Sequence, residues 1–186
     1  FENLSLGQDL REALGLNEKI LEIKLTPNRP DCLSIRGVAR ELSAILAQPL
    51  AEQPEFQQSQ SLQSAPKLAE APRIAVRDEA KTAGSALCGR FSSRIIRGVD
   101  ASRPTPGYIK QRLEQAGQRS ISILVDLSNY VMLALGRPTH IFDLDLIEPL
   151  HDAQLEVRWA REGEQYELLN GSSPALGSFF GVIADA

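Results

Sequence analysis

The first part of the chain begins with two short hydrophobic patterns of different period. Apolar residues from Leu6 to Leu14 recur at helical spacing, and Gly15 follows them as a suitable C-terminal cap, so this segment predicts a short helix. In residues 20–25 (ILEIKL) the apolar side chains of Leu21, Ile23 and Leu25 alternate with polar ones. That alternation places them on one face and predicts a strand.

The next segment combines a proline-containing loop with a longer amphipathic pattern. Residues 26–31 (TPNRPD) carry two prolines, which exclude a regular helix or central strand and predict a rigid loop. Ser34 is a suitable N-cap for the helix that the following stripe predicts. The members of that apolar stripe are Ile35, Val38, Ala39, Leu42, Ile45 and Leu46. Residues 48–72 then change to Gln, Ser, Pro, Ala and Glu, which predicts a linker.

The remaining chain mixes strand and helix patterns without a regular alternation. Apolar or alternating runs predict strands at 73–78, 87–99, 121–126, 154–160 and 179–186. Helical spacing predicts one helix from Thr105–Pro106, read as N-cap and first turn, to Gly117, and a shorter one from Ser128 to Gly136. Residues 137–143 read as a loop, and Asn170–Gly171 as a tight turn.

These elements predict an α+β fold. We expect a small helical N-terminal unit (1–47), a linker (48–72) and a domain (73–186) with a mixed or antiparallel sheet and short helices. The 186 residues include 42% hydrophobic and 24% charged residues, which argues against disorder throughout the chain. The first residue is Phe and the last segment is apolar, so we expect both ends to be cut from a longer protein.

Charge and cysteine content exclude several classes of protein. The formal net charge is −4, which argues against a strongly basic nucleic-acid clamp, and we expect no DNA partner. No apolar run reaches membrane-spanning length, so we expect no membrane partner. Cys32 and Cys88 form no CxxC pair, which excludes a cysteine zinc site or disulfide framework and favours the reducing cytoplasm.

The common catalytic motifs are missing from the sequence. It contains no GxSxG, Walker or GxGxxG motif, and its two histidines, His140 and His151, form no HExxH pair. We therefore predict no metal site and no covalent nucleophile, and both cysteines read as small packing residues. Composition and spacing alone indicate an α+β domain without an assigned chemistry.

Three long strings carry a family resemblance. They are LEIKLTPNRPDCLSIRGVARELSAI (21–45), GRFSSRIIRGV (89–99) and QRSISILVDLSNYVMLALGRPTHIFDLDLI (118–147). Together with LEVRWAREGEQYELLNG (155–171), they resemble in order the bacterial phenylalanyl-tRNA synthetase beta subunit. The resemblance implies that this chain contains the end of the subunit's N-terminal helical module and the front part of its editing domain, truncated at the C-terminus.

The resemblance also implies a function. In that family, two alpha and two beta subunits form a cytoplasmic heterotetramer; the alpha subunit carries out ATP- and Mg²⁺-dependent charging, and the beta subunit hydrolyses tyrosine mischarged on phenylalanine tRNA. The expected partners are therefore the alpha subunit and tRNA, with no cofactor in this chain itself. The alternative is a noncatalytic module that positions tRNA and assembles the subunits.

Two residues match polar positions of the family's editing pocket. Asn129 lies in the SNYV string and His140 in the PTHIFD string. For a lone Asn or His, a capping or structural role is the simpler interpretation, and the resemblance favours a site role. The family's other pocket residues would follow Ala186, so we expect half a pocket and an inactive fragment. The family's usual Gln and Trp are replaced here by Arg137 and Tyr108.

Several charged residues allow both a functional and a structural interpretation. Arg90, Arg94 and Arg97 would share a face of the predicted strand 87–99, where they could contact tRNA phosphate or simply be solvated. Asn28 and Arg29 suggest a nucleic-acid contact, but we favour an alternative in which Arg29 or Asp31 ties the loop to the following helix.

Asp126 and Asp143 resemble a pair of catalytic carboxylates. We favour the simpler interpretation that each caps a turn or helix. Trp159 reads as a core or half-buried sheet residue.

Overall fold

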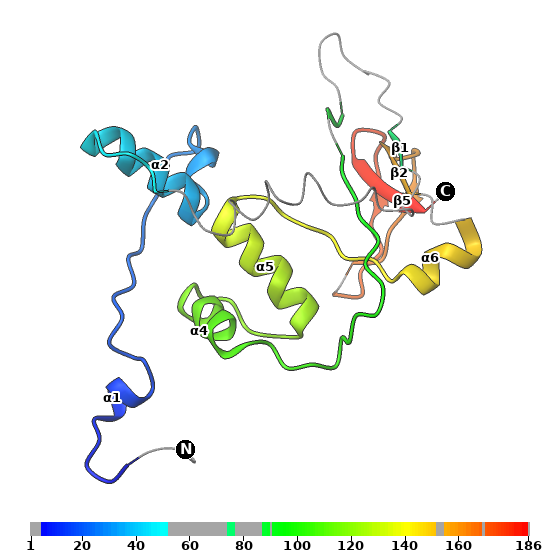
Figure 1. Cartoon of the computed structure of the whole chain (residues 1–186). Helices are drawn as coiled ribbons and strands as arrows, with labels where there is room; N and C mark the ends of the chain where they lie inside the picture. Colours follow the sequence, from blue (N-terminus) through cyan, green and yellow to red (C-terminus); the bar gives the residue numbers. More distant parts are fainter. Residues whose placement is uncertain are drawn as a thin grey trace, which may run out of the picture. The chain divides into compact units, whose positions relative to one another are not determined.

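The structure of the chain is a computed structural model, and Figure 1 shows its elements. The residues that it describes are 5–51, 74–76, 87–89, 91–151, 155–168 and 170–185. They form helices, a mixed three-stranded sheet and a two-stranded sheet. The predicted α+β class is therefore confirmed.

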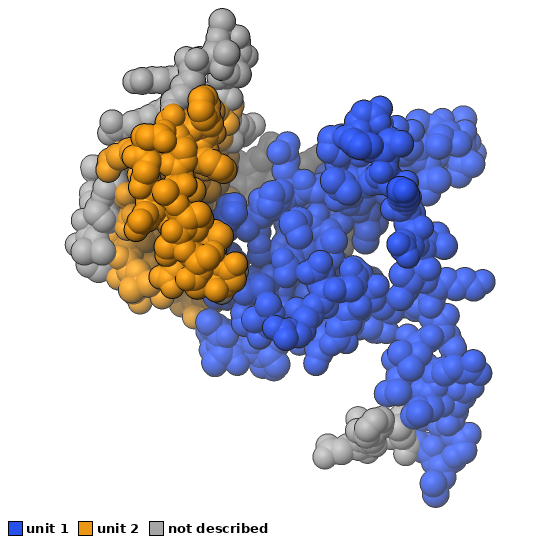
Figure 2. Space-filling model, turned by 180° about the vertical axis from the view of Figure 1, so that it is seen from behind, with its two compact units in different colours: residues 1–51, 100–141 blue, residues 52–99, 142–186 orange. Residues whose placement is uncertain are grey.

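The chain divides into two compact units, coloured separately in Figure 2. One combines Phe1–Ala51 with Asp100–Ile141, and the other combines Glu52–Val99 with Phe142–Ala186. Each unit thus joins two separate segments of the chain, whereas the predicted domains 1–47, 48–72 and 73–186 are continuous; those domain boundaries stay a prediction. Most of the predicted linker lies outside the described residues, and 48–51 form no helix or strand.

The first unit is helical in the described residues. Its elements are α1 (Leu10–Ala13), the 3-10 helix η1 (Pro30–Cys32), α2 (Ile35–Leu46), α4 (Gly107–Gln115) and α5 (Ile123–Leu135). Helix α5 packs against both α4 and α2. Leu113, Ile109 and Cys32 are buried in this unit, and Leu113 is fully buried.

Helix α2 begins where the sequence predicts. The Ser34 hydroxyl accepts a hydrogen bond from the Gly37 amide at 3.0 Å, as expected of an N-cap. Its packing differs from the expectation, because Ile35, Leu42 and Ile45 on the apolar stripe are 65%, 49% and 69% exposed. The side of the helix that bears Gly37 instead packs against the loop before it.

Residues 121–126 were expected as a strand, but Ile121 and Ser122 precede α5 and residues 123–126 form its first turn. Ser122 caps the helix, and its hydroxyl accepts a hydrogen bond from the Val125 amide. An apolar run of this length is compatible with either structure, and the cap at Ser122 decides for the helix. The expected cap at Ser128 is therefore also wrong, because Ser128 lies in the middle of α5. Gly136 ends the helix in the left-handed conformation, as predicted.

Two further strand predictions and one cap are wrong. Residues 20–25 and the described residues of 87–99 form no strand, because a strand needs a hydrogen-bonded partner and the described residues supply none for them. Pro106, not Thr105, is the N-cap of α4, without a side-chain hydrogen bond. The Thr105 hydroxyl bonds to Asp126 instead.

The second unit contains the sheet. Its elements are β1 (Ile74–Val76), α6 (Leu144–His151), β2 (Leu155–Trp159), β3 (Glu164–Gln165), β4 (Ala175–Leu176) and β5 (Gly181–Asp185). Strand β2 is central: it runs parallel to β1 and antiparallel to β5, so the sheet is mixed as predicted. Leu155, Val157 and Ala160 are buried here, and Trp159 is half-buried.

Strands β3 and β4 form a small antiparallel pair. The chain between them contains the predicted turn, in which the Gly171 amide donates to the Leu168 carbonyl at 2.8 Å. The Asn170 side chain accepts hydrogen bonds from the Ser172 amide and hydroxyl. The turn is confirmed. Among the described helices, none combines the length and hydropathy needed to cross a membrane.

Candidate functional site

The candidate site lies along α5 and the part of the following loop that ends at Ile141, within the first unit. The start of the helix is fixed by Asp126, which is fully buried. Its carboxylate accepts hydrogen bonds from the Ser120 hydroxyl at 2.6 Å, the Ile121 amide at 2.9 Å and the Thr105 hydroxyl. Burial alone would raise the pKa of Asp126, but these hydrogen bonds outweigh it and hold the pKa below its usual value. Asp126 therefore fixes the segment before α4 to the start of α5.

The middle of α5 is joined to the 137–143 loop by neutral hydrogen bonds. The Ser128 hydroxyl lies 2.7 Å from the Thr139 carbonyl, to which it donates, and 2.8 Å from the Thr139 hydroxyl. Gly136 makes this possible, because its left-handed conformation ends the helix and lets the chain turn back along it. We call the Ser128–Thr139 contact the helix–loop contact.

The two editing-pocket candidates are the sequence neighbours of this contact. Asn129 follows Ser128 on α5, and His140 follows Thr139 in the loop. Asn129 is half-buried, and its side-chain amide forms no hydrogen bond with any described residue. His140 is exposed. The fold therefore brings together the SNYV and PTH strings, whose polar residues lie eleven positions apart in the sequence.

The arginines suggested for tRNA contact belong to the second unit. Arg94 and Arg97 are exposed, and they lie in a stretch without regular structure. Residues 91–97 are not a strand, so the argument for a shared face no longer applies; a strand would also place Arg94 and Arg97, three residues apart, on opposite faces. Arg90 lies outside the described residues. A tRNA contact by these three residues stays a prediction.

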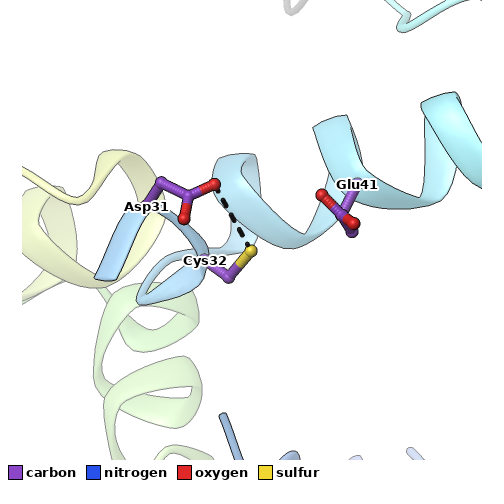
Figure 3. Close-up of side chains that lie close together, drawn as sticks. All are labelled: Asp31, Cys32 and Glu41. Atoms are coloured by element: carbon purple, nitrogen blue, oxygen red, sulfur yellow. Dashed lines mark hydrogen bonds between the residues drawn. The ribbon is translucent and has the colours of Figure 1, made fainter. Parts of the chain in front are cut away.

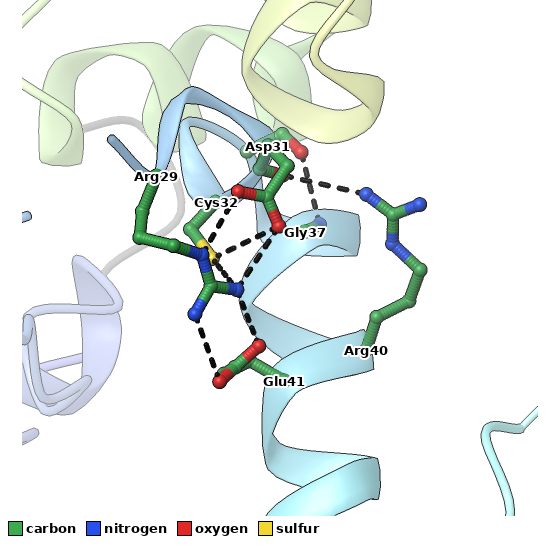
Figure 4. Close-up of polar contacts among 7 residues, drawn as sticks. Arg29, Asp31, Cys32, Gly37, Arg40 and Glu41 are labelled. Atoms are coloured by element: carbon green, nitrogen blue, oxygen red, sulfur yellow. Dashed lines mark hydrogen bonds and ion pairs between the residues drawn. The ribbon is translucent and has the colours of Figure 1, made fainter. Parts of the chain in front are cut away.

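The TPNRPD loop is tied to α2 by Arg29 (Figure 4). Its guanidinium donates to Glu41 on α2, with Nη1 at 3.0 Å from Oε1, and to both carboxylate oxygens of Asp31, each at 3.0 Å. The Arg40 side chain also donates to the Asp31 carbonyl. The expected tie between loop and helix is confirmed. We call Arg29, Asp31, Cys32 and Glu41 the Arg29 cluster.

The protonation of the Arg29 cluster follows from these contacts. Hydrogen bonds from Arg29 lower the pKa of Asp31 to about 2, and they also lower the pKa of Glu41. Burial raises the pKa of the Cys32 thiol, which keeps it protonated and unreactive. The same contacts with Glu41 and Asp31 raise the pKa of Arg29.

The cluster also contains a set of potential metal ligands (Figure 3). The ligand atoms of Asp31, Cys32 and Glu41 lie within 4.8 Å of one another. However, the Arg29 guanidinium contacts all three and supplies the positive charge that a cation would bring. The arrangement is an ion-paired structural cluster.

Each residue of the suggested carboxylate pair has a structural role within its own compact unit. Asp126 and Asp143 fall in different compact units. Asp143 is exposed and accepts a hydrogen bond from the Asp145 amide at the start of α6, at 3.0 Å. The simpler interpretation of Asp143 as a capping residue is confirmed, while Asp126 serves the structural role described above.

Sequence reasoning missed two features of this unit. One is the helix–loop contact, for which Ser128 was read as a cap. The other is a cluster of Tyr108 and Arg112 on α4 with Tyr130 on α5. The spacing of Tyr108 and Arg112, four residues apart in a predicted helix, was the only signal in the sequence for that cluster.

Comparisons with known proteins agree with the sequence resemblance. The B3/4 domain family matches residues 87–186. A phenylalanine–tRNA ligase beta subunit of Burkholderia pseudomallei (strain 1710b) is 49% identical over 184 residues, covering 99% of this chain and 21% of the relative. The beta subunit of Cupriavidus pinatubonensis is 48% identical over 186 residues, with the same coverage. That of Bordetella pertussis is 49% identical over 182 residues, covering 95% of this chain and 20% of the relative.

The chain thus spans about a fifth of the length of the curated relatives that it matches. The resemblance to bacterial phenylalanyl-tRNA synthetase beta subunits that the sequence strings indicated is confirmed. The sequence of this chain is closely similar to part of phenylalanine–tRNA ligase beta subunits. Because the matched domain covers more than half of the chain, this protein belongs to the B3/4 domain family.

Proposed function

We propose that this chain is the part of a phenylalanine–tRNA ligase beta subunit that removes tyrosine mischarged on phenylalanine tRNA. The names of the relatives support the assignment of this chain to a phenylalanine–tRNA ligase beta subunit. With that assignment, the whole cytoplasmic synthetase would also require an alpha subunit, tRNA, ATP and Mg²⁺. A separate hydrolytic site is chemically reasonable, because an apolar pocket rejects an added hydroxyl group only weakly.

The helix–loop contact is the observation that carries the proposal. It joins the two segments of one unit that carry Asn129 and His140, through the neighbouring residues Ser128 and Thr139. A buried structural asparagine normally has its amide satisfied by the protein. The Asn129 residue is half-buried, its amide atoms reach solvent, and they have no partner among the described residues, which leaves its donor and acceptor available to a substrate.

The proposed reaction is hydrolysis of the ester between tyrosine and the terminal ribose. The oxygen of water bonds to the ester carbonyl carbon, the bond from that carbon to the ribose oxygen breaks, and a proton passes to the ribose oxygen. The products are free tyrosine and uncharged tRNA. Asn129 would orient the substrate, and His140 would hold the water or bond to the ribose or ester, so that catalysis depends on positioning.

This chain alone is expected to deacylate poorly. Selecting tyrosine requires a group aimed at its hydroxyl, and no residue described here is assigned that role. The relatives are about five times as long as the chain, so other segments are available to complete the pocket. Misplacement of catalytic groups by about 1 Å costs on the order of 10²-fold in rate, so an incomplete pocket loses most activity.

The test uses the full-length protein in its native complex. We expect His140→Ala and Asn129→Ala each to slow deacylation of tyrosyl-tRNA for phenylalanine by about 10²-fold, with phenylalanine charging unchanged. Arg137→Ala, in the same exposed loop, and Asn17→Ala, an exposed asparagine elsewhere in the unit, serve as matched controls. Parental deacylation by both site variants would contradict the assignment.

A noncatalytic assembly module is the second candidate, and the exposed stripe of α2 favours it. Contiguous exposed apolar side chains often mark an interaction surface. If assembly is the role, Leu42→Ser with Ile45→Ser should abolish association with the alpha subunit, while the Asn129 and His140 variants deacylate normally. The two readouts therefore separate the two functions.

A further inference from the structure

The first unit exposes a cluster of two aromatic rings and one guanidinium group where α4 crosses α5. Tyr108 on α4 is 59% exposed. Its ring meets that of Tyr130 on α5 edge to face, with the ring centroids 6.4 Å apart. Arg112, one turn along α4, lies over the Tyr108 ring, with its guanidinium carbon 5.9 Å from the ring centroid. We call these three residues the Tyr108 cluster.

A hydrogen bond to Tyr130 fixes the arginine over one face of the exposed Tyr108 ring. Arg112 Nη1 donates a hydrogen bond to the Tyr130 hydroxyl at 2.8 Å. The other N–H groups of Arg112 form no hydrogen bond with any described residue. Because Arg112 covers one face of the Tyr108 ring, a base can stack only on the other face, while the unused donors of the held guanidinium can bind a phosphate.

The segment that carries the cluster has an excess of positive charge, whereas the other segment of the same unit, 1–51, has six Lys and Arg against seven Asp and Glu. Residues 100–141 contain five Lys and Arg, namely Arg103, Lys110, Arg112, Arg119 and Arg137, against three Asp and Glu. One of those three acids is Asp126, which is buried and therefore does not face the solvent. The chain as a whole has a net charge of −4. The positive charge is thus local to this segment and complementary to an RNA backbone.

We propose that the Tyr108 cluster binds a single-stranded segment of tRNA, with a base stacked on Tyr108 and a phosphate on Arg112. The choice of tRNA as partner rests on the proposed function; the choice of a single strand rests on the cluster itself. Base stacking on an exposed tyrosine requires an unpaired base, and one arginine beside it provides one phosphate contact. The surface holds tRNA outside the pocket and takes no part in hydrolysis.

The test measures binding of uncharged phenylalanine tRNA to the full-length protein in its native complex. Tyr108→Ala should weaken binding by about 30-fold, the middle of the effect of losing one stacked base, whereas Tyr108→Phe and Tyr108→Trp should stay within about twofold of the parent. Tyr166→Ala is the matched control, because Tyr166 is 61% exposed but belongs to the second unit. Thermal unfolding verifies that each variant is folded.

Arg112→Gln tests the phosphate contact separately. It should reduce the slope of log binding constant against log salt concentration by about one, whereas Arg11→Gln, at another exposed arginine of the unit, should leave the slope unchanged. Parental binding by Tyr108→Ala, or an equal loss in Tyr166→Ala, overturns the proposal. Because the tRNA is uncharged, these results do not depend on deacylation. A failure of the editing proposal would appear in the Asn129 and His140 assays and leave this effect measurable.

Discussion

The Arg29 cluster and the helix–loop contact both join a loop to a helix, but they differ in how fully their polar groups are used. In the Arg29 cluster, the guanidinium contacts two carboxylates and a thiol, and each partner is occupied. At the helix–loop contact, two hydroxyls and a carbonyl bond to one another, while the neighbouring Asn129 amide has no partner among the described residues. Saturated polar groups indicate a structural role, whereas an unsatisfied one leaves bonding capacity for a ligand.

Asp126 and Asn129 lie on the same helix, but the Asp126 carboxylate has three hydrogen-bond partners and the Asn129 amide has none among the described residues. Asp126→Ala would leave three donors without an acceptor in a buried place, so we expect a loss on the order of 3 kcal/mol in unfolding free energy. Asp143→Ala, at an exposed cap, should cost less than about 1 kcal/mol. Urea unfolding of the purified proteins measures both values, and equal losses would contradict the distinction.

Gly37 tests how closely the Arg29 cluster is packed. A Cβ atom at this position would lie 2.0 Å from the Asp31 carbonyl oxygen and 2.9 Å from the Cys32 Cα. Gly37→Ala must therefore displace backbone, and we expect a loss of about 2 kcal/mol. Gly107→Ala is the matched control, because nothing lies within 4 Å of its added Cβ. If Gly37→Ala were as stable as Gly107→Ala, the backbone of the TPNRPD loop would be able to move away from the added Cβ atom at little cost, and the cluster would not be closely packed.

The helix–loop contact should have a smaller effect on stability and a clearer one on function. Ser128→Ala removes hydrogen bonds to the Thr139 carbonyl and hydroxyl, and Thr139→Val removes only the second. We expect about 1 kcal/mol for Ser128→Ala, and less for Thr139→Val. Deacylation by the full-length complex should fall with Ser128→Ala, because the loop that carries His140 is released. Unchanged deacylation would mean that the contact does not position His140.

The sequence predicted those parts of this fold that depend on local chemistry. The Ser34 cap and the Gly136 stop are set by residues next to the helix ends, and both were identified correctly. Residues 121–126 were assigned wrongly, since an apolar run carries no period that separates strand from buried helix. Residues 20–25 have a strand pattern, but no local signal states whether a partner strand is present.

The candidate site was predictable to a similar extent. The bond between Arg29 and Asp31 follows from a cation and a carboxylate two residues apart in a proline-restricted loop, whereas Glu41, the partner of Arg29 on α2, came from the structure. The helix–loop contact does not follow from spacing, because Ser128 and Thr139 meet only through the turn at Gly136. Asn129 and His140 were chosen as site candidates because of the family resemblance. The structure then showed that each of them is next to a residue of the helix–loop contact.

The pH dependence of the Arg29 cluster gives the smallest expected effect. Hydrogen bonds from Arg29 lower the pKa of Asp31 to about 2 in the folded chain, against about 3.9 in an unfolded one. Because the folded pKa is the lower one, the unfolded state takes up the proton first as the pH falls. The stabilisation from this pair is therefore complete above about pH 4 and is lost as the pH approaches 2.

Arg29→Gln removes the charge that lowers the pKa of Asp31, so this variant should lose less stability than the parent between pH 4 and pH 2. Its melting temperature should lie below that of the parent at pH 7, and the difference should narrow on acidification. The difference should be small, because the Arg29 and Asp31 side chains are 36% and 52% exposed and solvent screens the pair. Arg11→Gln is the matched control, since its pair with Asp9 is longer, at 3.8 Å, and more exposed. A constant difference between parent and Arg29→Gln from pH 7 to pH 2 would show that Arg29 acts through packing instead of charge.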